Sequence, residues 1–294
     1  MRVLITGLRG FTGRYVAEEF EAAGWEVWGL GRRQAADVAR YRAVSLSDVD
    51  GLRAYVCEVR PSAVVHLAGI ASVAHDDGNA LYQVNLLGTR NLLSALAECA
   101  VRPECVVLAS SAHVYGDSIA GMLTESAPPL PANDYGVSKL AMEHMARQWL
   151  DRLPVVIARP FNYTGAGHSE RFLFPKILAH FRDRAPCIEL GNLDVARDFS
   201  DVRMIARAYR RIVEARPVGE TFNLCSGRAN SIHEILDIAS DITGHSLQVN
   251  VNPAFVRQGE VRRLWGDPSR LAGLLGEWPP PSLERTARWM LGVE

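Results

Sequence analysis

A phenol and an ammonium lie four residues apart in the stretch Tyr135-Gly136-Val137-Ser138-Lys139. If this stretch is helical, the two side chains share one face, one above the other. Because a nearby ammonium favours the phenolate, Lys139 is expected to lower the pKa of Tyr135 from its ordinary value of about 10, which suits a general acid or base. Taken alone, the pair indicates an ordinary helical Tyr and Lys more than a catalytic pair, so other stretches must support the assignment.

A second candidate stretch is rich in glycine and follows a short apolar run. Thr6-Gly7-Leu8-Arg9-Gly10-Phe11-Thr12-Gly13 comes after Val3-Leu4-Ile5 and before an amphipathic pattern that extends to Ala23, which predicts a strand, a turn and a helix. In a dinucleotide site, Gly7 would permit the tight turn, Gly10 the approach of a pyrophosphate and Gly13 close packing of helix on strand. The residues expected to bind the cofactor here are Gly7, Gly10, Phe11, Thr12 and Gly13. The spacing is G-x-x-G-x-x-G, and a glycine-rich turn without a ligand is the alternative.

The residues after the second predicted strand indicate which dinucleotide would bind. Glu26-Val27-Trp28-Gly29-Leu30 has the pattern of that strand, and its end lacks the acidic residue that would bind the ribose hydroxyls of NAD. Arg32 and Arg33 follow instead, and guanidinium groups suit a ribose 2′-phosphate. NADP(H) is therefore the preferred cofactor and NAD(H) remains possible, with a solvated basic turn as the alternative.

The order of the remaining elements predicts an α/β fold. Further strands are expected at 41–44, 63–67, 105–109 and 155–158, with helices at 49–59 and 81–99 between them. This alternation predicts a Rossmann-type, doubly wound parallel sheet with a smaller C-terminal α/β substrate-binding lobe. We expect residues 1–160, with a later segment at about 198–226, to form the NADP-binding domain, and residues 161–197 and 227–294 to form the lobe.

Two of these strands end in residues that could face a ligand. Leu67-Ala68-Gly69 ends the fourth strand, where sheets of this kind place the cofactor, whereas His66 is expected to be a packed strand residue. Ser110-Ser111 ends the fifth strand, and a hydroxyl there could bond a substrate oxygen beside Tyr135, although two serines at a strand end are also ordinary turn chemistry. Asp134 is a candidate N-cap for the helix that carries Tyr135.

Composition and charge argue against several classes of function. The net charge of −1 at pH 7 gives no electrostatic reason to expect nucleic acid or an anionic membrane as a partner, and no apolar run reaches the roughly 20 residues of a membrane span. Since no signal peptide precedes the first strand, a cytoplasmic location is expected. The eight histidines form no metal-ligand spacing, so no metal is expected. The five cysteines are expected to be reduced core thiols, because they are scattered along the chain as Cys57, Cys99, Cys105, Cys187 and Cys225.

Six ordered motifs resemble the extended short-chain dehydrogenase/reductase family. They are T-G-x-x-G-x-x-G at 6–13, H-L-A at 66–68, N-x-x-G-T-x-N-L-L at 85–93, S-S-x-x-V-Y-G at 110–116, Y-x-x-x-K at 135–139 and R-P-x-N at 159–162. The resemblance implies that Ser111 orients the substrate carbonyl and that Tyr135 is the acid/base. It also implies that Lys139 activates Tyr135 and binds the nicotinamide ribose. Ser45 departs from the family pattern, which often has Asp at this position, beside the adenine.

The C-terminal half is similar to the nucleotide-sugar branch that handles GDP-mannose derivatives. The matching stretches are 159–165, 174–176, 197–202 and 257–261. By this resemblance, the diphosphate of GDP would be held by Asn162, Lys176, Arg197 and Arg257, and its ribose by Glu260. Cations and an amide suit a diphosphate chemically. The alternative is that Arg197 and Arg257 are surface charges.

Missing groups point to one reaction within this branch. His113 stands where the related dehydratases have a catalytic Glu and the fucose synthases a catalytic Cys, and Phe172 stands where the fucose synthases have a His. The resemblance therefore implies reduction of the C4 ketone of a GDP-4-keto-6-deoxy-hexose to GDP-D-rhamnose or its C4 epimer, with His113 as a substrate contact. A nucleotide-sugar 4-epimerase with tightly bound NAD and a non-catalytic dinucleotide-sensing protein are the alternatives. A homodimer is common in the family and is expected here.

Overall fold

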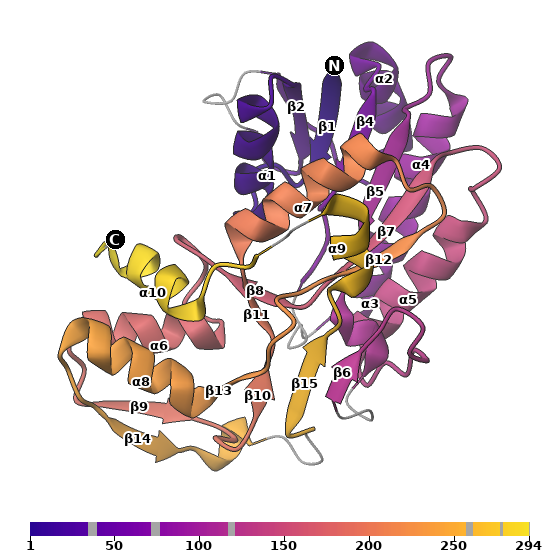
Figure 1. Cartoon of the computed structure of the whole chain (residues 1–294). Helices are drawn as coiled ribbons and strands as arrows, with labels where there is room; N and C mark the ends of the chain where they lie inside the picture. The colour runs from indigo at the N-terminus through magenta and orange to yellow at the C-terminus, as the bar shows by residue number, and fades with distance from the viewer. Residues whose placement is uncertain (35–39, 72–76, 117–120, 257–260, 277–278, 294) are drawn as a thin grey trace.

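A seven-stranded sheet forms the centre of the protein in a computed structural model (Figure 1). The structure describes residues 1–293 except 35–39, 72–76, 117–120, 257–260 and 277–278. The strand order is β12-β7-β5-β4-β1-β2-β3, and all neighbouring strands are parallel. The strands are β1 Arg2–Thr6, β2 Glu26–Gly31, β3 Tyr41–Ala43, β4 Ala63–His66, β5 Cys105–Ala109, β7 Val155–Pro160 and β12 Thr221–Leu224. The chain runs outward from β1 in one direction and then from β4 in the other, so the predicted doubly wound, Rossmann-type α/β fold is confirmed.

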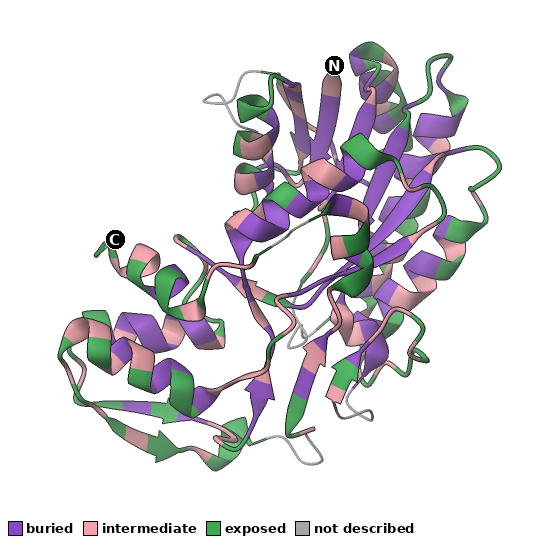
Figure 2. Cartoon of the chain, in the orientation of Figure 1, coloured by how far each residue is buried: buried purple, intermediate pink, exposed green. Residues whose placement is uncertain are grey.

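Helices cover both faces of this sheet, because successive strand residues point to opposite sides. Val3 and Ile5 of β1 pack in one apolar core with α1, α7 and α9, whereas Leu4 packs in another with α2, α4 and α5. Figure 2 shows the buried residues running along the strands between the two helical layers. The helices are α1 Phe11–Ala22, α2 Val49–Val59, α4 Thr89–Glu98, α5 Asp134–Arg147, α7 Val202–Ala215 and α9 Ser269–Leu275.

A smaller lobe has an apolar core of its own. Three helices, α6 Leu173–Arg182, α8 Ile232–Thr243 and α10 Leu283–Leu291, pack there with the strand pair β9 Cys187–Leu190 and β14 Gln248–Val251. Further short strands form the sheet β13-β10-β15-β6 and the pair β11-β8. Their bounds are β6 Gly121–Leu123, β8 Asn162–Thr164, β10 Ala196–Arg197, β11 Phe199–Asp201, β13 Asn230–Ser231 and β15 Arg263–Gly266, with a 3-10 helix, η3, at Pro253–Phe255. The division of the chain at residues 160, 197 and 227 stays a prediction.

Two local features near α5 differ from expectation. The helix expected at 81–99 is three segments, α3 Gly78–Leu81, the π-helical η1 Tyr82–Gly88 and α4. Asn85 in η1 is buried and its amide donates to Ile70 O at 3.1 Å and to Ser138 Oγ at 3.1 Å. Asn133, not Asp134, caps α5, since its side chain accepts a hydrogen bond from Gly136 N at 2.9 Å. Asp134 is the first helical residue, where its charge suits the positive end of the helix.

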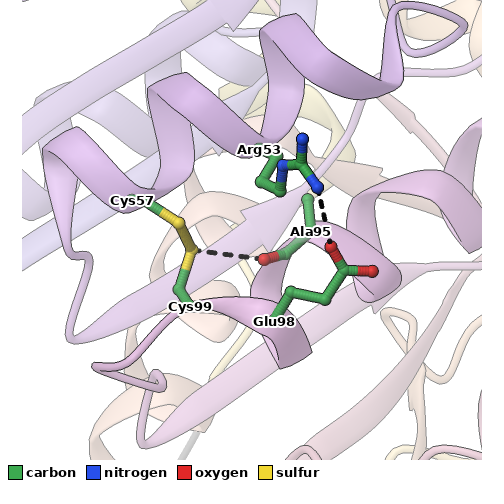
Figure 3. Close-up of a disulfide and its surroundings, with 5 residues drawn as sticks. All are labelled: Arg53, Cys57, Ala95, Glu98 and Cys99. Carbon is green, nitrogen blue, oxygen red and sulfur yellow. Dashed lines mark hydrogen bonds and ion pairs between the residues drawn. A yellow bond between two sulfur atoms is a disulfide. The ribbon is translucent and has the colours of Figure 1, made fainter.

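The expectation of reduced core cysteines is wrong for three of the five. Cys57 on α2 and Cys99 at the end of α4 form a disulfide, which Figure 3 shows beside the Arg53–Glu98 ion pair. Cys187 is free and exposed, whereas Cys105 and Cys225 are free and buried. The disulfide joins residues 42 positions apart, and it is the packing of α2 against α4 that brings them together. Spacing along the sequence carries no sign of such a contact.

Candidate active site

The three predicted catalytic residues come from two segments that meet at the carboxyl end of the central sheet. Tyr135 and Lys139 lie in the first turns of α5, and Ser111 lies between β5 and the 3-10 helix η2 Ala112–Tyr115. These segments pack against each other, and Ser111, Tyr135 and Lys139 are all buried. The structure therefore brings the Ser111 hydroxyl to the phenol and the ammonium, which lie 24 and 28 residues further along the sequence.

Tyr135 is protonated at neutral pH. Burial raises the pKa of Tyr135 to about 12, and a side-chain hydrogen bond with Ser111 lowers it in part. The expected lowering of this pKa beside Lys139 is wrong: the pKa lies above its ordinary value because burial has the largest effect on it. Tyr163, a partly buried neighbour, raises the pKa further. The site as folded thus holds a neutral phenol bonded to a serine hydroxyl, an arrangement that can donate a proton.

Lys139 lies between the ends of β4 and β5. Its Nζ donates a hydrogen bond to Ala109 O at 2.8 Å, at the end of β5. A Cβ at Gly69, just beyond β4, would lie 3.4 Å from the same nitrogen, so glycine leaves room there. Burial lowers the pKa of Lys139 to about 8, and the charge of Glu143 raises it in part. Lys139 therefore carries its charge at neutral pH and begins to lose it in mildly alkaline solution.

The glycine-rich turn has the shape that a pyrophosphate requires. Gly7 has φ of 72°, and a Cβ there would lie 2.9 Å from Ala68 N. A Cβ at Gly13 would lie 2.3 Å from Gly7 O, so only glycine permits the close packing of α1 on the turn. Gly10 is the N-cap of α1, where backbone N–H groups can bind phosphate oxygens. These residues fit a dinucleotide.

The other predicted cofactor residues surround this turn. Thr12 Oγ1 lies 2.8 Å from Tyr163 OH, and the Phe11 ring stacks on His168 with centroids 4.2 Å apart. Leu67 and Ala68 continue from β4, their backbone nitrogens donating to Thr6 O at 3.2 Å and to Thr6 Oγ1 at 3.0 Å. The exposed pair Arg32 and Arg33 comes directly after β2. This is where the ribose of a bound dinucleotide is expected.

His66 is a packed strand residue, as predicted. Its Nδ1 lies 2.6 Å from Thr6 Oγ1 and its Nε2 lies 2.9 Å from Thr89 Oγ1. Burial lowers the pKa of His66 to about 3, and the charge of Lys139 lowers it further. A neutral imidazole held on both sides by threonines has a structural role, so His66 is not a candidate acid or base.

The predicted substrate residues are spread over several elements. The His113 ring lies edge-on to Tyr135, with centroids 5.4 Å apart, so His113 borders the catalytic residues. Asn162 is exposed on β8, and Arg197 is partly buried on β10. Lys176 on α6 donates to Glu189 O at 2.6 Å and lies 5.0 Å from the Phe255 ring centroid. Arg257 and Glu260 lie outside the described residues. The roles of these residues toward a diphosphate stay predictions.

Two further residues belong to this site although the sequence alone does not single them out. Tyr163, on β8, bonds Thr12 and acts on the pKa of Tyr135, so it connects the glycine-rich turn to the candidate catalytic phenol. Glu143 is completely buried, one turn after Lys139 on α5. The spacing of Tyr135, Lys139 and Glu143 in steps of four is a signal that could find Glu143, since it puts all three on one helix face.

A cavity of about 460 Å³ opens in the lobe, away from the catalytic residues. Its lining includes Asp194, His233 and Arg262, and also Val195, which precedes β10 and Arg197. Within the described parts of the chain, His, Cys, Asp and Glu do not gather in a group of three or more that could hold a metal. No helix among those parts is long and apolar enough to cross a membrane.

Two known proteins are similar in sequence to this chain over nearly its whole length. A family model described as the NAD dependent epimerase/dehydratase family matches residues 3–225. GDP-6-deoxy-D-talose 4-dehydrogenase of Aggregatibacter actinomycetemcomitans is 32% identical over 279 residues, which cover 94% of this chain and 92% of that protein. GDP-6-deoxy-D-mannose reductase of Pseudomonas aeruginosa is 34% identical over 301 residues, covering 99% of this chain and 96% of that protein.

Two solved structures match the fold along the full chain. One, of a protein from Burkholderia cenocepacia J2315, is 51% identical with a TM-score of 0.94 and covers 99% of this chain and 97% of that one. The other, RMD from Pseudomonas aeruginosa complexed with NADPH, is 32% identical with a TM-score of 0.85. The match covers 99% of this chain and 98% of that one. The predicted membership of the extended short-chain dehydrogenase/reductases is confirmed. The chain belongs to the NAD dependent epimerase/dehydratase family and is an NAD(P)-dependent nucleotide-sugar oxidoreductase.

Proposed function

We propose that this protein reduces the C4 ketone of a GDP-4-keto-6-deoxy-hexose, such as GDP-4-keto-6-deoxy-D-mannose, to GDP-D-rhamnose or its C4 epimer. The observation that carries the proposal is the protonated, buried Tyr135 in hydrogen-bond contact with Ser111, with Lys139 on the next turn of α5. The two curated relatives act on GDP-6-deoxy sugars by name, and they support this choice of nucleotide and sugar.

The residues of this chain suit the proton part of such a reduction. A dinucleotide whose pyrophosphate is bound at the glycine-rich turn would supply the hydride for the ketone carbon from its nicotinamide ring. Ser111 would hold the carbonyl oxygen, and Tyr135 would give its proton to that oxygen as negative charge develops there. The Lys139 ammonium would stabilise the phenolate that remains, and burial makes this attraction stronger than it would be in water.

We propose NADP(H) as the preferred cofactor. Arg32 and Arg33 follow β2 on the surface, and a guanidinium can bind a 2′-phosphate through two hydrogen bonds. The similar RMD structure complexed with NADPH supports this preference.

His113 favours reduction over elimination of water. A dehydratase needs a carboxylate to take a proton from the sugar. By the resemblance of its motif, this chain has His113 at that position, and the His113 ring lies beside Tyr135. Ketone reduction requires no such group. We therefore assign His113 to substrate contact, together with Asn162, Lys176 and Arg197 and with Arg257 and Glu260 outside the described residues. The homodimer and the cytoplasmic location stay predictions.

The test is to incubate the purified protein with GDP-4-keto-6-deoxy-D-mannose and NADPH. We expect one NADPH to be oxidised for each ketosugar consumed, and the product to be GDP-D-rhamnose or GDP-6-deoxy-D-talose by NMR. The matched controls are 4-keto-6-deoxy sugars on UDP and dTDP, with thermal shifts in GDP, UDP and dTDP as a measure of nucleotide preference. No NADPH oxidation with the GDP ketosugar would overturn the substrate assignment.

The same assay distinguishes a nucleotide-sugar 4-epimerase. Such an enzyme would use the same Ser111, Tyr135 and Lys139, because it oxidises C4 and then reduces it from the other face. It would retain NAD through purification and interconvert two nucleotide sugars without consuming added NADPH. Stoichiometric loss of NADPH favours the reductase, whereas interconversion with the dinucleotide unchanged favours the epimerase.

A further inference from the structure

A buried polar cluster lies directly behind the catalytic residues. Glu143 accepts a hydrogen bond from Ser110 Oγ at 2.6 Å. Arg159 of β7 binds the same carboxylate through Nε at 2.8 Å and Nη2 at 2.6 Å. Arg159 also donates from Nη1 to Tyr115 OH at 3.0 Å, and Tyr115 OH donates to Asn223 Oδ1 at 2.7 Å. The cluster therefore connects α5 to the ends of β5, β7 and β12.

The stability of the core does not explain why this charged cluster is buried. Glu143 is fully inaccessible and Arg159 is 4% exposed, so both charges have lost their water. Such buried pairs cost so much desolvation energy that well-packed apolar residues of similar volume are often at least as stable. The cluster's position suggests another role, because Ser110 directly precedes Ser111 and Glu143 lies one turn after Lys139.

We propose that Glu143 is a positioning residue of the active site: its carboxylate, oriented by Arg159, ties the Ser111 segment to α5 and keeps the Lys139 ammonium charged. Through Ser110 it would fix the distance between the serine hydroxyl and the helix that carries Tyr135. Through its charge it would act on Lys139 without touching it, since Lys139 Nζ bonds Ala109 O. The proposal holds for any reduction or oxidation at this site and does not depend on GDP.

Among the groups around Lys139, Glu143 is the one whose negative charge favours the ammonium form of Lys139. Burial lowers the pKa of Lys139 to about 8, and the Glu143 charge is the effect that opposes it. Tyr135 on the same helix is neutral at this pH, and so is His66 on β4. The cations of Arg159 on β7 and Arg147 on α5 are both paired with Glu143 itself. From η2, Tyr115 is neutral because burial raises its pKa, and the His113 ring faces Tyr135.

The composition of the chain makes the charge effect measurable at single side chains. Lys139 and Lys176 are its two lysines, since 30 of the 32 residues counted as Lys+Arg are arginine. Protein labelled with carbon-13 at lysine Cε should therefore give two resonances, which Lys176→Arg assigns. The dependence of each resonance on pH reports the titration of one side chain, and Lys176 is an internal control.

The key variant is Glu143→Gln, which removes the charge and keeps the shape. In the unmodified protein Lys139 should titrate near its pKa of about 8. In Glu143→Gln the pKa of Lys139 should fall by about one pH unit or more, whereas the titration of Lys176 should be unchanged. Glu98→Gln, an exposed carboxamide substitution on α4, is the matched control and should move neither resonance. An unchanged Lys139 titration in folded Glu143→Gln would overturn the proposal.

Ser110→Ala tests the tether separately from the charge, because Glu143 keeps its bonds to Arg159. We expect kcat to fall by about tenfold with KM nearly unchanged, since only the alignment of the reacting groups is lost. The Lys139 titration should stay where it is. A kcat equal to that of the unmodified protein would overturn the positioning role.

A second variant and a measurement that needs no substrate allow the proposal to be tested in every case. If Glu143→Gln does not fold, Glu143→Asp replaces it: the charge is retained, so Lys139 must still titrate near pH 8, and a fall of a full pH unit would contradict the proposal. The NMR titration needs neither substrate nor cofactor. Its result therefore stands even if the GDP ketosugar fails in the activity assay.

Discussion

Ser111 and Tyr135 share a side-chain hydrogen bond in a place from which water is nearly excluded, the two residues being 5% and 7% exposed. The two hydroxyls converge, so that a substrate oxygen bonded to one would lie within reach of the other. Burial raises the pKa of the phenol to about 12, so Tyr135 holds a proton at neutral pH that a substrate oxygen in this place could receive.

Replacing Tyr135 by Phe should remove this proton donor and retain the ring. We expect kcat for ketone reduction to fall by about 10²- to 10⁴-fold, the usual contribution of general acid catalysis. NADPH affinity, measured by fluorescence titration, should stay within a factor of about two or three, because the substitution leaves the glycine-rich turn intact. Tyr82→Phe is the matched control, as the Tyr82 hydroxyl bonds Asp134 at the start of the same helix. Near-normal turnover by Tyr135→Phe would refute the proton-transfer role.

Lys139 should set the alkaline limit of the reaction. Its pKa of about 8 means that it is charged below that pH and neutral above it, whereas Tyr135, with a pKa of about 12, stays protonated throughout. The value of kcat/KM should therefore be level near neutral pH and fall by about tenfold per pH unit beyond the apparent pKa. Lys139→Arg keeps the charge at every accessible pH, so its slower reaction should lack this limb. A limb that persists in Lys139→Arg would show that another group is responsible.

Local periodicity predicts the Tyr135–Lys139 pair, whereas the candidate role of Ser111 follows from the resemblance of its motif. The four-residue step from Tyr135 to Lys139 needs only a helix, and the turn at Gly7 needs only the strand before it. The pKa of Tyr135 depends instead on how completely distant segments exclude water, and Tyr163, which contributes to it, is 28 residues away along the chain. The Cys57–Cys99 disulfide likewise depends on the packing of two helices. The π-helical turn at Asn85 requires one extra residue per turn, which an apolar pattern does not reveal.

The arginines after β2 should select the phosphorylated dinucleotide. We expect the double substitution Arg32→Ala/Arg33→Ala to weaken NADPH binding by about 10- to 100-fold, the loss expected when a hydrogen bond to a charged group worth about 1.5–3 kcal/mol is removed. NADH lacks the 2′-phosphate, so its affinity should change little and serves as the control. Fluorescence titration of both cofactors gives the ratio. An equal loss for NADPH and NADH would show that these arginines do not recognise the phosphate.

The Cys57–Cys99 disulfide should contribute to stability and not to catalysis. It closes a loop with a sequence separation of 42, for which the chain-entropy model gives about 4 kcal/mol. The double variant Cys57→Ser/Cys99→Ser should therefore have a lower Tm, while kcat and KM stay close to those of the unmodified protein. Cys187→Ser is the control, because Cys187 is free and exposed.

Counting thiols tests the disulfide directly. Denatured protein should expose three thiols before reduction, those of Cys105, Cys187 and Cys225, and all five cysteines after it. Five thiols before reduction would mean that the bond does not form under the conditions of purification. The stability difference between oxidised and reduced protein should then vanish as well.

Buried His66 should make the protein sensitive to acid. Burial lowers its pKa from 6.5 to about 3, so between these values the unfolded chain binds a proton that the native protein does not. The stabilisation is complete above about pH 6.5 and is lost as the pH falls toward 3. At pH 4.5 the loss should be about 3 kcal/mol. Urea unfolding at pH 7 and 4.5 measures it: His66→Gln should lose about 3 kcal/mol less between the two pH values than the unmodified protein does. His144→Gln, on the exposed side of α5, should show the full loss, and an equal loss in His66→Gln would mean that His66 is not held neutral.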